Sequence, residues 1–188
     1  PNGTSHELLQ LYYADQAKES VRFQNNMLVK RLEQQVNLDQ EVRRACARSR
    51  GAQPCPQKKI LRIAERTARC GDVFADVLVK NGKMSPLDRH LFSEMTCIFQ
   101  RFIQPPTLIV DLDSSPEECD KRIRIRSRKA ESGIPIEYLE SISAGYRQML
   151  YEGDWKECVR RVQNVDGMHC SPEGAVIVED LISEALSM

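Results

Sequence analysis

Residues 107–131 read TLIVDLDSSPEECDKRIRIRSRKAE, and this stretch decides the fold class. Thr107 to Leu112 is short and rich in residues that favour β-structure, which predicts a strand. Ser114-Ser115-Pro116-Glu117-Glu118 follows with a capping pattern that predicts the start of a helix. Strands that alternate with helices are typical of α/β proteins with a parallel sheet.

The rest of the chain continues this alternation. Further strands are predicted at residues 59–64 and 161–165, and further helices at residues 7–11, 19–50, 66–79, 85–103, 136–151 and 173–186. We therefore expect a single α/β domain over residues 1–188, with a parallel sheet and helices on both faces.

Composition excludes several classes of protein. The 188 residues are 41% hydrophobic and 29% charged, as in ordinary globular proteins, and 27 Lys and Arg balance 27 Asp and Glu. This neutral balance, with one short basic stretch at residues 121–129, argues against a nucleic-acid partner. The sequence contains no run of ~18 apolar residues, so it does not predict a segment that spans a membrane or a membrane partner. Seven scattered cysteines without metal-site spacing indicate reduced thiols in a cytosolic compartment.

The basic stretch is the first candidate site. On a helix Arg122 and Arg126 share one face, one turn apart, and Arg128 lies just beyond. Guanidinium groups gathered in this way can bind a polyphosphate and stabilise charge during phosphoryl transfer. A solvated basic helix face is the alternative interpretation of the same spacing.

Two further groups of residues are candidates. Glu65 and Arg66 follow the strand predicted at residues 59–64, and ligands in parallel sheets lie at the carboxyl ends of strands. A surface ion pair would explain the same two residues. Tyr13, Phe23 and Gln24 combine aromatic faces with an amide that can read the edge of a nucleobase. Taken alone, these residues fit better with Phe23 in the core and Gln24 as an ordinary polar residue of a helix.

In combination these segments resemble the deoxynucleoside kinase family over nearly the whole chain. Residues 8–13, LLQLYY, resemble the family's LLxxMY segment, and Phe23-Gln24 follows at the family's spacing. Residues 65–67, ERT, are similar to its ERS or DRS motif, and residues 114–119, SSPEEC, to the stretch before its arginine-rich lid. Residues 133–139, GIPIEYL, resemble its GIPLEYL. The resemblance implies a P-loop-kinase-like, doubly wound parallel sheet flanked by helices.

The resemblance also implies roles for individual residues. Tyr13 and Glu131 would bind the sugar 3′-hydroxyl, Gln24 would read the base and Phe23 would pack against it. Arg66 would steer the 5′-hydroxyl and the transferred phosphate, and Glu65 would support Mg²⁺. The lid, about residues 121–133, would clamp the ATP phosphates. Its ATP-binding residues would be Arg122, Arg126 and Arg128, and the loop of Asp166, Gly167 and Met168 would cradle adenine.

The expected reaction is transfer of the γ-phosphate of ATP to the 5′-hydroxyl of a deoxynucleoside in nucleotide salvage. No GxxxxGK[ST] occurs in the chain, so we expect the first strand, the P-loop and the catalytic glutamate upstream of Pro1. A catalytically inactive nucleoside- or partner-binding homologue is the main alternative, and a nucleoside monophosphate kinase is a second. We expect a homodimer, in the cytoplasm (of the host, if the protein is viral) or the mitochondrion.

The base-binding positions bear on substrate choice. Arg31 matches a position where deoxycytidine kinases carry an arginine, but its acidic partner there is Gly71 here. The small Gly71 is expected to leave room for a thymine methyl group. The sequence therefore favours thymidine or another pyrimidine deoxynucleoside.

Overall fold

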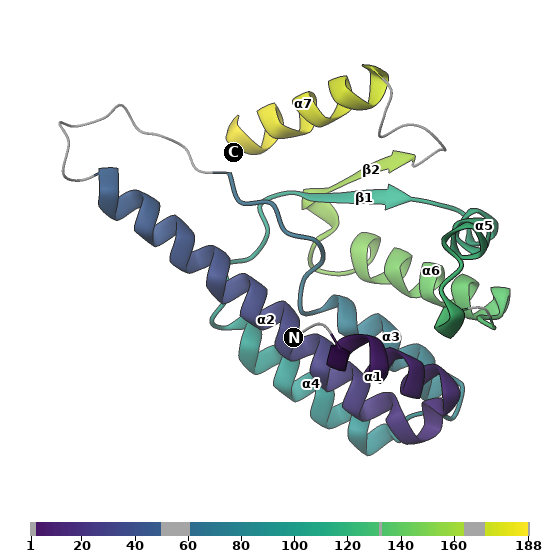
Figure 1. Cartoon of the computed structure of the whole chain (residues 1–188). Coiled ribbons are helices and arrows are strands. Elements are labelled where there is room, and N and C mark those ends of the chain that lie inside the picture. The colour runs from purple at the N-terminus through teal and green to yellow at the C-terminus, as the bar shows by residue number, and fades with distance from the viewer. Residues whose placement is uncertain (1–2, 50–60, 132, 164–171, 188) are drawn as a thin grey trace.

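The computed structural model describes residues 3–49, 61–131, 133–163 and 172–187. Its helices are α1 (Gly3–Ala14), α2 (Gln16–Ser49), α3 (Cys70–Lys80), α4 (Pro86–Gln100), α5 (Pro116–Arg126), α6 (Ile136–Tyr151) and α7 (Pro172–Ser187), with the 3₁₀ turns η1 (Lys129–Glu131) and η2 (Lys156–Cys158). Its strands are β1 (Ile109–Asp113) and β2 (Val159–Gln163). Helices α6 and α7 lie on opposite sides of the strand pair, and α1 to α4 gather below α6 (Figure 1).

The core lies among the first four helices. Tyr12, Leu28, Leu78, Met84 and Phe92 are buried together there. The long helix α2 contributes one face, because its buried residues recur at helical spacing. This face consists of Ser20, Gln24, Leu28, Arg31 and Gln35. Its polar members are candidate ligand contacts, since a buried polar group needs a hydrogen-bond partner.

Both predicted serine caps are confirmed. Ser85 Oγ accepts a hydrogen bond from the backbone N–H of Asp88 at 3.1 Å, and Ser115 Oγ accepts one from the N–H of Glu118 at 3.2 Å. A proline occupies the first position of each helix, where its missing N–H costs nothing. The sequence therefore fixes where α4 and α5 begin.

The strands β1 and β2 form a parallel pair, with Ile109 opposite Val159 and Asp113 opposite Gln163. Helices α5 and α6 form the connection between them in the chain. The strand expected at residues 107–112 and the parallel arrangement are confirmed, and the strand expected at 161–165 begins two residues earlier. On β1 the apolar Val110 and Leu112 remain exposed.

Two sequence-based expectations are wrong. Residues 61–64 form no strand, and Ile63 is 73% exposed. Within the described residues β1 and β2 pair only with each other, so the 61–64 backbone has no hydrogen-bonding ladder to join. The helix expected from Arg66 begins instead at Cys70, because Arg66 has φ 63°, a left-handed conformation that an α-helix cannot contain.

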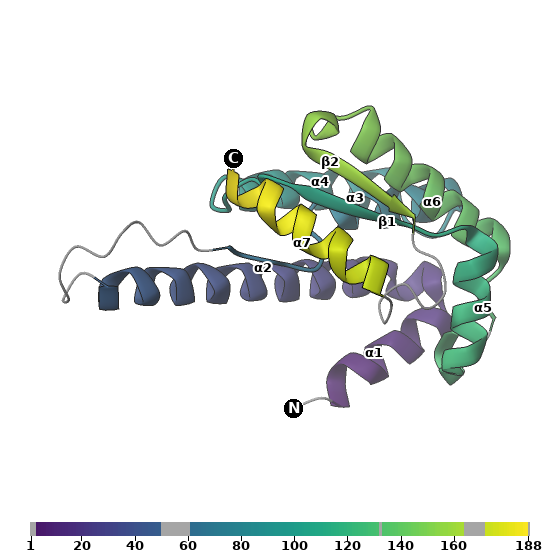
Figure 2. The ribbon, with the colours of Figure 1, turned by 90° about the horizontal axis from the view of Figure 1, so that it is seen from above.

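None of the helices in the described ranges combines the length and the hydropathy that crossing a bilayer requires. Viewed from above, α2 extends well beyond the rest of the molecule, and α5 crosses the end of α6 opposite to it (Figure 2). This arrangement brings the end of α5 and η1 next to α1, which positions the first part of the candidate site.

Candidate functional site

Tyr13 and Glu131 form one end of the site. Tyr13 lies near the end of α1, and Glu131 ends η1, which packs against α1. Glu131 is 7% exposed, although its side chain is a carboxylate. Burial raises the pKa of Tyr13, the charges of Tyr138 and Glu131 raise it further, and Arg126 opposes this shift. A cavity of about 390 Å³ opens beside Tyr13, Lys129 and Gly133.

Two arginines compensate the buried carboxylate. Arg126 Nη2 lies 2.5 Å from Glu131 Oε2, and Arg128 Nη1 lies 3.4 Å from Oε1. Arg122, the third predicted phosphate ligand, turns elsewhere and contacts Glu118 at 2.9 Å and Ser114 at 3.2 Å. The structure therefore brings Arg126 and Arg128 together at Glu131, while Arg122 contacts Ser114 and Glu118 at the start of α5.

The predicted aromatic group is partly a core feature. Phe23 stacks on Tyr12, with ring centroids 4.3 Å apart, and Tyr13 meets Tyr12 edge-on at 5.0 Å. Gln24 is buried on the next position of α2. The structure thus brings Tyr13, Phe23 and Gln24 into one neighbourhood, but Phe23 already has an aromatic partner.

Arg31 is a buried cation with an unused donor. The residue is 8% exposed, and its Nη1 has no hydrogen-bond partner among the described residues. Burial lowers the pKa of Arg31, while the neighbouring Cys70 and Tyr146 favour its charge. Because an unpaired buried donor is costly, this group is a candidate for contact with a ligand.

Gly71 lies against this arginine. A Cβ atom there would be 2.8 Å from Phe92 Cζ and 3.3 Å from Arg31 Nη1, so only glycine fits without movement of the neighbours. Phe92 and Arg31 therefore occupy the position that a side chain at residue 71 would take. Room for a thymine methyl group beside Gly71 stays a prediction.

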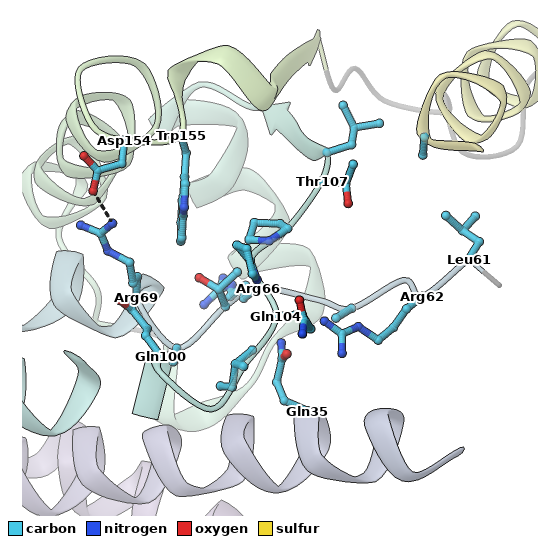
Figure 3. Close-up of a pocket in the computed structure, with 18 of the residues that line it drawn as sticks. Gln35, Leu61, Arg62, Arg66, Arg69, Gln100, Gln104, Thr107, Asp154 and Trp155 are labelled. Atoms are coloured by element: carbon cyan, nitrogen blue, oxygen red, sulfur yellow. Dashed lines mark hydrogen bonds and ion pairs between the residues drawn. The ribbon is translucent and has the colours of Figure 1, made fainter. Parts of the chain in front are cut away.

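Arg66 lines a separate pocket, and Glu65 directly precedes Arg66 in the chain. A cavity of about 880 Å³ is lined by Gln35, Arg62, Arg66, Arg69 and Trp155, with the segment from Gln104 to Leu108 as another wall (Figure 3). Arg69 pairs with Asp154 at 3.3 Å and stacks over Trp155. The pocket touches Thr107 and Leu108, at the amino end of β1, rather than the carboxyl end that the argument from sheet topology indicated.

The two predicted residues there remain open to a ligand. Arg66 Nε is 4.0 Å from Glu65 Oε1, and the Arg66 guanidinium lies 5.6 Å from the centre of the Phe74 ring. Within the described chain no group of three or more His, Cys, Asp or Glu side chains is placed to hold a metal ion. Magnesium held mainly by nucleotide phosphates needs only one or two carboxylates, and the exposed Glu65 could supply one.

Some polar atoms at the site were not anticipated from the sequence. Gln35 Oε1 and Tyr146 Oη are buried without a hydrogen-bond partner in the described residues. Gln35 could have been found, since it is eleven residues after Gln24 on the same face of α2. Tyr146 offers no such signal. The predicted adenine loop, Asp166 to Met168, lies outside the described residues.

Comparison with known proteins identifies relatives of this chain. The sequence profile of the deoxynucleoside kinase family matches residues 2–182. The deoxyadenosine kinase of Dictyostelium discoideum is 26% identical over 144 residues, which cover 77% of this chain and 52% of that protein. The human mitochondrial thymidine kinase 2 is 34% identical over 100 residues, covering 52% of this chain and 38% of the relative.

Deoxycytidine kinase 2 of Gallus gallus is 30% identical over 83 residues, covering 43% of this chain and 31% of the relative. The chain thus spans about half, or less, of the length of these relatives. The match of the profile to nearly the whole chain, with the charged and aromatic residues described above, identifies this protein as a member of the deoxynucleoside kinase family.

Proposed function

We propose that the protein transfers the γ-phosphate of ATP to the 5′-hydroxyl of a deoxynucleoside, as a step of nucleotide salvage. The observation that carries the proposal is the meeting of Tyr13 and Glu131 with Arg126 and Arg128. A phenol beside a carboxylate suits a sugar hydroxyl, and guanidinium groups suit phosphate. Their contact joins the two halves of a nucleoside kinase site in one place.

In this proposal the nucleoside lies along the buried face of α2. Tyr13 and Glu131 bind the 3′-hydroxyl, Gln24 reads the edge of the base, and Phe23 packs against it. Arg31 supplies a further donor at the base end, since its Nη1 lacks a partner in the described chain. Arg66 steers the 5′-hydroxyl and the transferred phosphate.

The phosphate donor is proposed to lie against the lid, residues 121–133, with Arg122, Arg126 and Arg128 on its phosphates and Asp166 to Met168 around adenine. Mg²⁺ would neutralise charge on the phosphates, with Glu65 as its carboxylate contact. The residues of this chain then contribute position and positive charge, with no covalent intermediate. Closure of the lid would exclude water that competes for the phosphate.

A thymidine or other pyrimidine substrate is favoured by the base end. Nη1 of Arg31, which has no hydrogen-bond partner in the described residues, needs an acceptor, and thymine offers carbonyl oxygens. An amino group in that position would leave the donor unpaired, which a specific site disfavours strongly. Phe92 next to Gly71 narrows the same region, and this favours a one-ring base over a purine.

The fold is proposed to be the full doubly wound sheet of a P-loop kinase. Parallel sheets are normally covered on both sides and contain several strands, whereas β1 leaves Val110 and Leu112 exposed. In this proposal a further parallel strand lies between β1 and residues 61–64, along the large cavity. A donor from that strand would then bind Gln35 Oε1, which has no hydrogen-bond partner in the described residues. We propose that chain outside residues 1–188 supplies this strand, the phosphate-binding loop and the base for the 5′-hydroxyl.

Assembly and location are also proposals. The exposed Leu87, Leu91 and Ile98 lie along one side of α4, and such a stripe favours a homodimer of single-domain subunits. The described cysteines Cys70, Cys97, Cys119 and Cys158 are free thiols, in keeping with a reducing compartment such as the cytoplasm.

A nucleoside-binding protein without kinase activity is the alternative. In that protein the ion pairs of Arg126 and Arg128 with Glu131 would serve to hold the nucleoside site together rather than to bind phosphate. The competition of thymidine with deoxyguanosine tests the main proposal, with the full-length protein, ATP and Mg²⁺. Thymidine should be phosphorylated in clear preference, and equal turnover of the two would contradict the assigned base site. Tight binding of thymidine without any product would support the alternative.

A further inference from the structure

The contact between Glu131 and the arginines of the lid joins residues with different proposed partners. Each carboxylate oxygen of Glu131 faces one guanidinium, Arg126 at 2.5 Å and Arg128 at 3.4 Å. The side chain of Glu131 is buried, whereas those of Arg126 and Arg128 are 49% and 54% exposed. One end of each ion pair is therefore fixed in the protein, and the other end reaches solvent.

Local backbone geometry produces this contact. Helix α5 ends at Arg126, and Ser127 follows in the left-handed conformation with φ 52°. The reversal at Ser127 lets the next turn, η1, return Glu131 to the end of the helix. Ser127 Oγ donates to the carbonyl oxygen of Arg124 at 2.7 Å, which holds the reversal in place.

The guanidinium groups have capacity for a second ligand. An arginine has five N–H donors, and the contacts with Glu131 involve one nitrogen of each guanidinium. The remaining donors of these half-exposed groups can bind phosphate while the first contact persists. Glu131 likewise retains lone pairs, because a carboxylate can accept about four hydrogen bonds.

We propose that Arg126 and Arg128 are positioning residues for Glu131, and that they link the phosphate donor to recognition of the sugar 3′-hydroxyl. A donor phosphate that binds the outer edges of both guanidinium groups holds their inner edges on Glu131. The carboxylate is then fixed opposite Tyr13, and the 3′-hydroxyl finds its acceptor already oriented. The nucleoside and the phosphate donor consequently bind with positive cooperativity, which must be reciprocal.

This inference rests on the proposed function and is tested by equilibrium binding to the full-length protein. Calorimetry gives the Kd of thymidine and of 3′-deoxythymidine, each with and without a non-hydrolysable ATP analogue and Mg²⁺. For the wild type we expect thymidine to bind about tenfold more tightly than 3′-deoxythymidine, with a larger ratio when the analogue is present. Arg126→Gln should reduce the ratio severalfold and remove the effect of the analogue on it.

Arg124→Gln is the matched control. Arg124 lies on the same helix and pairs with Asp120 at 2.8 Å rather than with Glu131, so its replacement should leave the ratio unchanged. Arg128→Gln provides a second test if Arg126→Gln does not fold. A ratio in both glutamine variants equal to that of the wild type would overturn the inference, and so would equal weakening of both nucleosides. If the wild type bound neither nucleoside, the proposed function itself would fail.

Discussion

Substitutions of Arg66 distinguish the effect of its backbone conformation on stability from the role of its side chain in catalysis. Arg66 has φ 63° and directly precedes the region where α3 begins. A residue with a Cβ atom in this conformation costs about 1–2 kcal/mol, which glycine avoids. Residues in such conformations often occur at functional sites, where the surrounding structure maintains them.

The magnitudes follow from this geometry. Arg66→Ala keeps the backbone strain and loses the contact with Phe74, which contributes about 0.5–1 kcal/mol at an exposed site. Arg66→Gly loses the same contact but relieves the strain, and the greater freedom of its unfolded chain offsets part of the gain. We therefore expect the glycine variant to be more stable than the alanine variant by about 0.5–1 kcal/mol.

Turnover should respond differently. Both variants lack the guanidinium, so both should lose about 10²–10³-fold in kcat, as when one preorganised donor is removed. Urea denaturation followed by circular dichroism measures stability, and phosphorylation of thymidine by the full-length protein measures kcat. Near-normal turnover in either variant would refute the role of Arg66. A glycine variant less stable than the alanine variant would refute the backbone conformation.

Two further predictions concern stability. Burial raises the pKa of Asp72 from 3.8 to about 6 despite Arg89 Nη1 at 3.1 Å. The folded chain then binds the extra proton between these values, so stability falls as pH rises through this window. Asp72→Asn should remove this pH dependence, which amounts to on the order of 3 kcal/mol in the free energy of unfolding for a shift of about 2 pKa units. Urea midpoints that change equally between about pH 4.5 and pH 7.5 in both proteins would contradict this prediction. In Gly145→Ala the new Cβ would lie 2.7 Å from Val73 Cγ1, so we expect the free energy of unfolding to fall by about 1 kcal/mol. Adding Val73→Ala should remove this clash, so the effects of the two substitutions on stability should not be additive. Additive effects in urea denaturation would contradict the clash.

The helix starts could be predicted because their signals are local. Ser85 and Ser115 each cap the N–H three residues ahead, so the sequence contains both partners of the bond. The strand β1 could likewise be predicted, at residues 107–112, from its β-rich composition. Residues 61–64 are also mostly apolar but form no strand, because a strand requires a neighbouring strand that composition cannot reveal.

The site was predictable as a set of residues but not as a set of contacts. The resemblance named Arg126, Arg128 and Glu131 for separate tasks, and their meeting depends on the left-handed Ser127. Serine is not strongly biased to this conformation, so the reversal had no clear signal in the sequence. Arg31 was named for its position, but its unpaired Nη1 follows from tertiary packing against Gly71 and Phe92.

Transfer of labelled phosphate tests the central claim most directly. The full-length protein would be incubated with γ-labelled ATP, Mg²⁺ and thymidine, beside the 188-residue chain and the Arg66→Ala variant. The account predicts labelled thymidine 5′-monophosphate from the full-length protein, and at least 100-fold less from the variant. Absence of labelled product from the full-length protein with every deoxynucleoside would contradict it.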